Sequence, residues 1–278
     1  MIYTLTLNPS LDYAANIREL VKGALNRTSK ESLTAGGKGI NVSFMLKTLG
    51  IQSEALGFEA GFTGEQIKAA LLQSGIKNDF VKVKNGISRI NVKLLESDGT
   101  ETEINASGPS IEKEEREALL KKLDSIQNKS TLVLAGSVPP SLPKDFYAQI
   151  MERLKNKEID FVVDASGPLL QTVLKLKPFL IKPNLYELQE LFSTKICGKD
   201  EVVQYAQKLR EKGALNVLVS LGKDGAVLAS QDGSAFFAAA PNGKAVNTVG
   251  SGDSMLAAFI ASFAEEKSFS KALAASVC

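Results

Sequence analysis

Histidine is absent from the 278 residues of this chain, and so is tryptophan. Without histidine there can be no Ser-His-Asp triad and no histidine-ligated metal, so a general base has to be a carboxylate, lysine, tyrosine or cysteine. The two cysteines, Cys197 and Cys278, match neither a metal motif nor a disulfide framework. Such sparing use of cysteine is typical of a reducing compartment and predicts a cytoplasmic protein.

The chain also lacks a charge excess and a long apolar run. Its 33 Lys and Arg residues nearly balance its 31 Asp and Glu residues, which leaves a formal charge of +2. This balance gives no field for wrapping nucleic acid or gripping an anionic membrane, although a local basic site stays open. No apolar run approaches about 18 residues, and Met1–Tyr3 lead into a strand-like segment without the features of a signal peptide. We therefore expect no nucleic-acid partner, no membrane span and no secretion.

Short β-rich segments alternate with amphipathic helical segments, which predicts a single α/β domain over residues 1–278. The predicted strands cover residues 2–7, 54–58, 131–135, 161–164, 179–182 and 217–221, and the first two helices cover 39–49 and 64–74. The later strands are continuously apolar, as in a parallel sheet buried on both faces. The fold class is therefore a central, mostly parallel sheet flanked by helices.

Two segments, residues 12–34 and 88–105, interrupt this alternation. Within the second, Arg89–Leu94 alternate polar and apolar side chains, and Ser97–Gly99 supply a hairpin turn. The pattern predicts a small antiparallel β-sheet inserted in the domain, and such covering sheets act as lids that exclude water from a pocket. Since exposed strands are usually paired, we expect a homodimer formed through this lid.

Small residues stand at the start of a predicted helix near the C-terminus. The segment Asn247–Ser254 contains Gly250, Gly252 and Asp253 and leads into the apolar helix Met255–Phe263. Free backbone amides at a helix start can receive an anion, and an aspartate in the first turn could accept a hydroxyl proton. This arrangement suits phosphoryl transfer. Taken alone, it is equally consistent with an aspartate that only caps the helix.

A second glycine-rich helix start, Ala35–Val42, contains three glycines, a lysine and an asparagine. These residues suit a polyhydroxylated, phosphorylated ligand. No Ser or Thr follows a Gly-Lys pair at the Walker A spacing, and Gly36–Gly39 do not match the dinucleotide fingerprint. Both a P-loop and a Rossmann-type oxidoreductase are thereby weakened.

Three other segments have a functional and a structural interpretation. Asp12 follows the first strand, where open α/β sheets bind ligands, but a surface turn would also explain it. Asn184 and Glu187 could hold metal-bound water near phosphates, or could cap a helix. The segment Ser220–Gly225 could let the backbone approach a nucleotide, or could form a hairpin.

Together these segments resemble the ribokinase-like carbohydrate kinases, in their phosphofructokinase B branch, in motif order and spacing from Thr6 to Asp253. The two family signatures are represented by Gly36–Asn41 and Val249–Asp253. The resemblance implies a ribokinase-like fold and an ATP-dependent, Mg²⁺-requiring phosphotransferase. Within the branch, the sequences most similar are those of enzymes that convert fructose 1-phosphate to fructose 1,6-bisphosphate, followed by kinases of tagatose 6-phosphate; the similarity rests on Asn8–Ser10, Asn26, Arg27, Lys38 and Arg89–Lys93.

The resemblance also implies roles for individual residues. Asp253 would be the base, Gly250, Ser251 and Gly252 would form the anion hole, and Asn184 and Glu187 would organise Mg²⁺ through water. The residues implied for the sugar phosphate are Asp12, Gly37, Lys38, Asn41, Arg89 and Ser137, of which Lys38 and Arg89, together with Arg27, would meet its phosphate. Those implied for the nucleotide are Lys182, Asn184, Ser220, Gly222 and Gly225.

The sequence departs from the family pattern in two places. Asn247 stands where many members carry aspartate, a difference that also occurs in this branch. Ser268–Cys278 begin an apolar helical pattern that stops without a C-terminal cap, so we expect the C-terminal helices to be incomplete and the natural chain to continue past Cys278. A sugar-phosphate sensor without catalysis remains an alternative function on the same fold, although the retained Asp253 argues against it.

Overall fold

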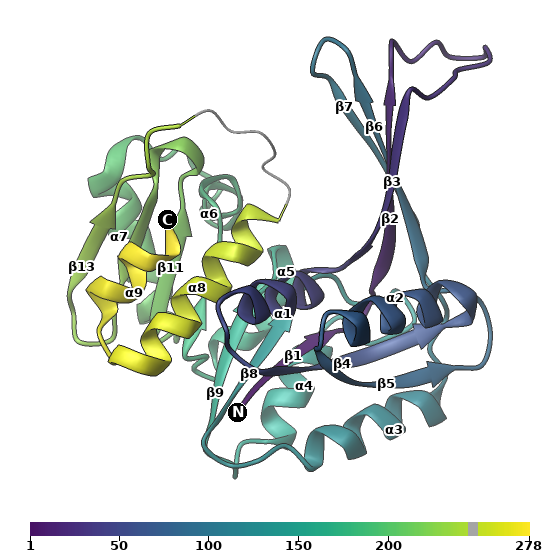
Figure 1. Cartoon of the computed structure of the whole chain (residues 1–278). Helices are drawn as coiled ribbons and strands as arrows, with labels where there is room; N and C mark the ends of the chain where they lie inside the picture. The colour runs from purple at the N-terminus through teal and green to yellow at the C-terminus, as the bar shows by residue number, and fades with distance from the viewer. Residues whose placement is uncertain (244–249) are drawn as a thin grey trace.

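The structure is a computed structural model that describes residues 1–243 and 250–278. Within these residues the chain forms a nine-stranded main sheet and a separate four-stranded sheet (Figure 1). The strands are β1 (Ile2–Thr6), β2 (Ser10–Ile17), β3 (Lys30–Gly36), β4 (Ser53–Ala60), β5 (Lys77–Val83), β6 (Arg89–Glu96), β7 (Glu101–Asn105), β8 (Ser130–Ala135), β9 (Ile159–Asp164), β10 (Leu180–Ile181), β11 (Asn216–Ser220), β12 (Ala226–Ala229) and β13 (Ala235–Ala238). The helices are α1 (Lys38–Thr48), α2 (Gly61–Gln73), α3 (Lys113–Asp124), α4 (Phe146–Arg153), α5 (Gly167–Leu174), α6 (Leu185–Phe192), α7 (Gly198–Glu211), α8 (Ser251–Glu266) and α9 (Phe269–Ser276), with a 3-10 turn at Gly222–Asp224.

The main sheet has the order β13-β12-β11-β10-β9-β8-β1-β4-β5. Within the described part of this sheet, neighbouring strands from β11 to β5 are parallel, and the two pairs that involve β12 are antiparallel. Strand β8 shows why such strands are continuously apolar: Leu132 and Leu134 pack into the core on one face, and Val133 and Ala135 into the core on the other. The predicted mostly parallel sheet, buried on both faces, is confirmed.

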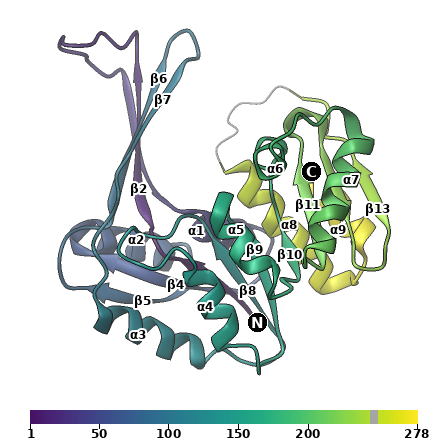
Figure 2. The same ribbon diagram turned by 180° about the vertical axis from the view of Figure 1, so that it is seen from behind.

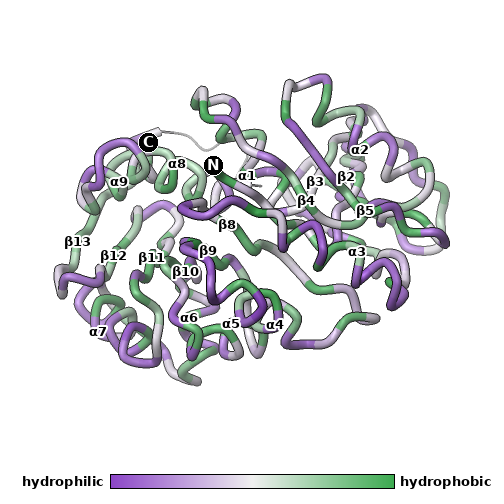
Figure 3. Tube along the Cα trace, turned by 90° about the horizontal axis from the view of Figure 1, so that it is seen from below, coloured by the Kyte–Doolittle hydropathy of each residue, from purple (hydrophilic) through white to green (hydrophobic). Residues whose placement is uncertain are grey.

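Helices cover both faces of the main sheet, as the view from below shows (Figure 3). Helices α1, α2, α8 and α9 pack on one face, and α3 to α7 pack on the other, where α3, α4 and α5 are seen from behind (Figure 2). No helix in the two described stretches is both long and apolar enough to cross a membrane.

Strands β2, β3, β6 and β7 form the small sheet, which projects from the main sheet and is called the lid below (Figure 1). Its order is β3-β2-β6-β7. The prediction of a fully antiparallel lid was wrong for the central pair, because β2 and β6 are parallel, whereas both outer pairs are antiparallel. The reason is topological: β2 follows β1 and β6 follows β5, and β1 and β5 run in the same direction in the main sheet, so both chains enter the lid in the same sense.

Gly225 connects the 3-10 turn to β12 and has a positive φ of 95°. A Cβ atom at this position would lie 2.0 Å from the carbonyl oxygen of Ala238 on the neighbouring strand. Strands β11 and β12 are antiparallel, so the hairpin interpretation of Ser220–Gly225 is confirmed. Glycine is required here by the close approach of two backbones as well as by the dihedral angle.

The packing of Gly225 can be tested against Gly233, whose φ of 89° is nearly the same but which has no atom within 4 Å of a Cβ position. Both Gly225→Ala and Gly233→Ala should lose about 1 kcal/mol or more to the positive φ. Gly225→Ala should lose a further 1–3 kcal/mol or so, because Gly225 has a ψ of −134°, outside the left-handed helical region, and because its new methyl group has to displace β13. Urea denaturation of the two variants measures the difference. Equal losses would contradict the packing argument.

Candidate active site

Two helix N-termini meet at the carboxyl end of the main sheet. Asp253 lies in the first turn of α8, is 6% exposed, and its Oδ2 accepts a hydrogen bond of 2.7 Å from Nδ2 of Asn41 on α1. Helix α8 begins after Gly250, whose φ is 77°, and no side chain caps it, so the interpretation of Asp253 as an N-cap was wrong. The first amides of α8, at Ser251 and Gly252, have no acceptor within the helix and can receive an anion.

Burial raises the pKa of Asp253 to about 6, because water no longer solvates its charged form. The hydrogen bond from Asn41 acts in the opposite direction, the negative charge of Asp164 adds to the rise, and the positive charges of Lys38 and Lys182 reduce it. A carboxyl group with a pKa near 6 is largely ionised at neutral pH and still basic enough to take a proton. Asp253 therefore has the properties of a general base.

Asp164 joins two of the site's cations. It ends β9, is 1% exposed, and lies 2.8 Å from Nζ of Lys38 and 3.2 Å from Nζ of Lys182. Burial is the largest single influence on the pKa of Lys38 and lowers it, but the charge and hydrogen bond of Asp164 together with the charges of Glu187 and Asp253 outweigh burial, so the pKa is raised. Our sequence analysis did not single out Asp164. The available signal was a carboxylate at the end of a continuously apolar strand, the edge where open α/β sheets bind ligands.

A cavity of about 700 Å³ lies over the ends of β1, β8 and β9. Four of the six residues predicted for the sugar phosphate line it: Gly37, Lys38, Arg89 and Ser137. Arg89 donates from Nε to the backbone oxygen of Asn8 at 3.1 Å; burial lowers its pKa, and the charge of Asp12 opposes this. The other two predicted residues lie apart from the cavity lining, Asn41 at Asp253 and Asp12 on the lid strand β2.

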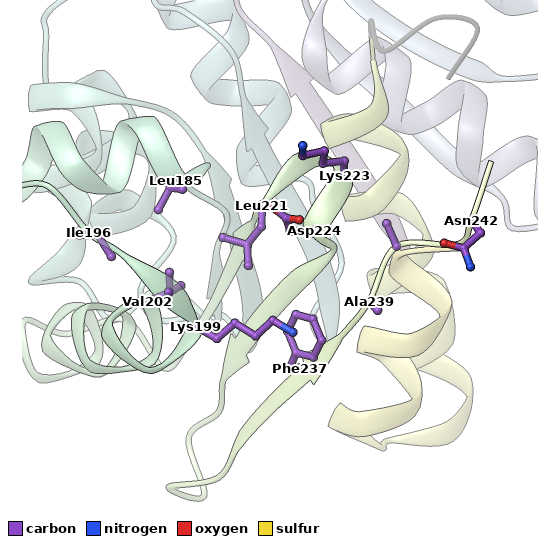
Figure 4. A pocket seen from close by; sticks show the side chains of 12 residues that line it. Leu185, Ile196, Lys199, Val202, Leu221, Lys223, Asp224, Phe237, Ala239 and Asn242 are labelled. Carbon is purple, nitrogen blue, oxygen red and sulfur yellow. The ribbon is translucent and has the colours of Figure 1, made fainter. Parts of the chain in front are cut away.

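A second cavity, of about 480 Å³, lies on the other side of β10 (Figure 4). It is lined by Leu185, Ile196, Gly198, Lys199, Val202, Leu221, Lys223, Asp224, Phe237, Ala239, Ala240 and Asn242. Nζ of Lys199 lies 3.3 Å from the centroid of the Phe237 ring. The predicted nucleotide residues Ser220, Gly222 and Gly225 do not line this cavity, but their chain neighbours Leu221, Lys223 and Asp224 do. Gly225 is required for packing against β13. The sequence analysis missed Lys199 and Phe237, which carry no local motif.

Asn184 and Glu187 form a reciprocal helix cap. Oδ1 of Asn184 accepts from the amide of Glu187 at 2.8 Å, and Oε2 of Glu187 accepts from the amide of Asn184 at 2.9 Å. The capping interpretation of this pair is confirmed. Asn184 also bridges to Ser220, which brings the cap to the end of β11. Residues 1–243 and 250–278 contain no cluster of three or more His, Cys, Asp or Glu side chains that could hold a metal.

Lys182 connects Asp164 to the start of α8. Its side chain is 6% exposed and its Nζ lies 3.2 Å from Asp164, and a Cβ atom at Gly252 would lie 3.1 Å from that Nζ, so the ammonium faces the first turn of α8. Asn247 and Val249 lie outside the described residues. Within the described part of the site, a buried base and a helix N-terminus lie near Lys38 and Asp164 of the larger cavity, an arrangement suited to transferring an anionic group.

Comparisons with known proteins agree with this arrangement. A 1-phosphofructokinase of Bacillus subtilis is 47% identical over 266 residues, which cover 96% of this chain and 86% of the relative. A D-tagatose-1-phosphate kinase of Bacillus licheniformis is 40% identical over 261 residues, covering 94% of this chain and 84% of the relative. The crystal structure of Escherichia coli phosphofructokinase-2 in complex with substrates and products superimposes with a TM-score of 0.92 at 30% identity, covering 98% of this chain and 89% of that one.

The family of these proteins is also matched directly. The model of the pfkB family of carbohydrate kinases matches residues 5–277, nearly the whole chain, including both glycine-rich helix starts and Asp253. The chain belongs to the pfkB family of carbohydrate kinases.

Proposed function

We propose that the chain transfers the γ-phosphoryl group of ATP to a hydroxyl of fructose 1-phosphate, forming fructose 1,6-bisphosphate. The observation that carries the proposal is the environment of Asp253, a buried carboxyl with a pKa of about 6 at the N-terminus of a helix, close enough to Lys38 and Asp164 of the larger cavity to feel their charges. Family membership supplies the reaction class, an ATP-dependent sugar kinase. The similarity to a 1-phosphofructokinase supports the acceptor.

In this mechanism the sugar hydroxyl gives its proton to Asp253 as its oxygen attacks the γ-phosphorus, the bond from that phosphorus to the bridging oxygen breaks, and ADP leaves with the bonding electron pair. The amides of Ser251 and Gly252, after the turn at Gly250, stabilise the charge on the transferred group. Lys182, whose ammonium faces Gly252, adds positive charge at the same place. Asn41 holds the Asp253 carboxylate in position.

The sugar phosphate binds in the cavity of about 700 Å³. Lys38 and Arg89 line this cavity and meet the phosphate that the substrate already carries, with Arg27 as a further cation from the lid. Gly37, also in the lining, has a φ of 120°, and a Cβ there would lie 2.7 Å from Cγ2 of Thr6, so glycine is needed for the backbone to pack at the cavity wall. Ser137 of the lining binds a sugar hydroxyl, and Asp12 from β2 and Asn41 from α1 reach other sugar hydroxyls from outside the lining.

ATP binds in the cavity of about 480 Å³, with the turn Ser220–Gly225 beside it. Its phosphates extend from there toward the start of α8, which the ammonium of Lys182 faces. Mg²⁺ accompanies the nucleotide, and the residues present fit it, because Mg²⁺ prefers oxygen ligands and keeps several waters. Glu187 uses only Oε2 in the helix cap, which leaves Oε1, together with Asn184, to accept metal-bound water. When bound, Mg²⁺ neutralises phosphate charge.

The lid supports a homodimer in which lids cover one another. Leu33, Tyr13, Val92 and Ile104 form a continuous row across all four lid strands, and Leu33 and Ile104 are 57% and 60% exposed. An exposed apolar face of this kind is suited to pairing with a second copy. We place the enzyme in the cytoplasm on the grounds of its sparse cysteines.

Sedimentation velocity tests the dimer. The parent chain should sediment as a dimer, and Ile104→Ser, which removes an exposed apolar side chain from the lid, should shift it toward monomer. A monomeric parent chain would refute the assembly.

The closest alternative acceptor is a tagatose phosphate. Tagatose 6-phosphate stays as an alternative on sequence grounds, and the similarity to a D-tagatose-1-phosphate kinase adds tagatose 1-phosphate. A lysine and an arginine in one cavity would hold the phosphate of any of these sugars, so the hydroxyl stereochemistry must decide between them.

ADP release with Mg-ATP tests the acceptor across fructose 1-phosphate, tagatose 1-phosphate, tagatose 6-phosphate, fructose 6-phosphate and free fructose. We expect kcat/KM to be highest for fructose 1-phosphate and lowest for free fructose, which lacks the phosphate. Preference for a tagatose phosphate would mean that this sugar phosphate, and not fructose 1-phosphate, is the acceptor.

Asp253→Asn should lower kcat by about 10²–10⁴-fold and still bind the sugar phosphate, since only proton transfer is lost. Asp232→Asn, in a surface turn, is the control. Full turnover by Asp253→Asn would refute its role as base.

The acid limb of the pH profile of kcat/KM reports the ionisation of Asp253 in the free enzyme. Activity should fall as pH drops through about 6, where the carboxylate becomes protonated. The hydrogen bond from Asn41 stabilises the charged form and holds the pKa down, so Asn41→Ala should move this limb to higher pH. Rate profiles between about pH 5 and 8 for the two proteins measure the shift. A limb that stays in place or moves to lower pH would contradict the assignment.

A further inference from the structure

The two oxygens of the Asp12 carboxylate have different surroundings. Oδ1 accepts hydrogen bonds from Oγ of Ser10 at 2.7 Å and from Nδ2 of Asn91 at 3.0 Å. The nearest cation to Oδ2 is Nζ of Lys93, at 3.7 Å, and Oδ2 accepts no hydrogen bond from the described residues. Since the side chain is 19% exposed, Oδ2 retains room and lone pairs for a ligand hydroxyl.

The position of this carboxylate is set closely by its neighbours. A Cβ atom at Gly36, on the adjacent strand β3, would lie 2.7 Å from Oδ2 and 2.8 Å from Cγ of Asp12. The backbone of β3 therefore lies against the carboxylate on one side, and Asn91 of β6 holds it on the other. Small changes in the direction of Oδ2 would change which hydroxyl geometry it accepts.

Asp12 forms one ion pair within the described residues, with Lys93, while Arg89 feels its charge from farther away. Lys93 also connects Asp12 to the outer strand of the lid. Its side chain is 13% exposed and its Nζ also lies 3.4 Å from Oε1 of Glu103 on β7. The other oxygen of Glu103 accepts from Nδ2 of Asn105 at 3.1 Å. Lys93 and Glu103 are direct partners in the β6–β7 register, so a row of alternating charge connects the outermost lid strand to Asp12.

We propose that Lys93 is a positioning residue for the sugar phosphate: its ammonium, held by Glu103, directs Oδ2 of Asp12 toward the sugar hydroxyl. The inference deepens the proposed function, because it rests on Asp12 binding the sugar. In the absence of sugar, the partly buried ammonium lies beside Oδ2 of Asp12 and keeps the carboxylate oriented. The lid thereby contributes to recognition through its outer strand as well as through β2.

The contrasting role for Lys93 is a cross-strand ion pair with Glu103 that only stabilises the lid. The two roles differ in their dependence on Asp12. If Lys93 acts through Asp12, its replacement should have no further effect once the Asp12 carboxylate is gone. If it only stabilises the lid, its effect should be the same with or without that carboxylate.

The test is a double-mutant cycle of Lys93→Met and Asp12→Asn, with Lys93→Arg as the conservative variant. We expect Lys93→Met to raise KM and Kd for fructose 1-phosphate about tenfold while the KM of ATP and kcat change less than about twofold, since the lost interaction orients the ground-state ligand. Lys93→Arg should restore most of the affinity. In the Asp12→Asn background, Lys93→Met should change Kd by less than about twofold. The matched control is Lys82→Met on β5, which breaks the exposed ion pair of Lys82 with Glu65 of α2 and should behave as the parent.

Titration calorimetry with fructose 1-phosphate, and with the preferred acceptor if that differs, measures Kd independently of turnover. An unchanged Kd for Lys93→Met, or an equal effect in both backgrounds, would overturn the inference and leave the proposed function intact. A parent protein that binds none of the ketohexose phosphates would overturn both.

Discussion

The buried charge of Asp164 is the constraint on which the arrangement of the active site depends. A carboxylate that is 1% exposed is tolerated only if cations compensate it, and here the cations are Lys38, at the start of α1, and Lys182, directly after β10. Lys38 lines the larger cavity and Lys182 faces the start of α8, so one buried charge fixes two cations around Asp253. Loss of Asp164 would leave the buried ammonium of Lys182 without its carboxylate partner.

The polar site is supported by an apolar helix pair. Val42 and Leu46 of α1 and Leu256 and Phe259 of α8 belong to one core cluster on the same face of the main sheet. Packing along the two helices sets where their N-termini lie, and the Asn41–Asp253 hydrogen bond forms at that end. Catalytic groups on the first turns of packed helices are held more rigidly than groups on free loops, which suits a reaction that depends on positioning.

Local sequence patterns predicted the elements well and the long-range contacts poorly. The glycine-rich helix starts and the carboxylate in the first turn of α8 were visible because they depend on neighbouring residues. The parallel pairing of β2 with β6 was not, because it depends on how two separate excursions leave the main sheet. Asn184 and Glu187 show a third case: their spacing fits a capping box and metal-bound water equally, and sequence alone cannot separate two uses of one pattern. Asp164 was missed because a single aspartate at a strand end is also common in surface turns.

The lid has a polar and an apolar face. Side chains alternate between faces along each strand, so Asp12 and Asn91 share one face, while Tyr13 and Val92 share the other with exposed Leu33 and Ile104. A slip of one residue in the β2–β6 register would place apolar side chains of β6 beside Asp12 and polar ones beside Tyr13. The parallel register therefore has to keep two different surfaces apart at once. This requirement explains why polar and apolar residues alternate so regularly in Arg89–Leu94, because a strand with only one specified face would leave every second residue free.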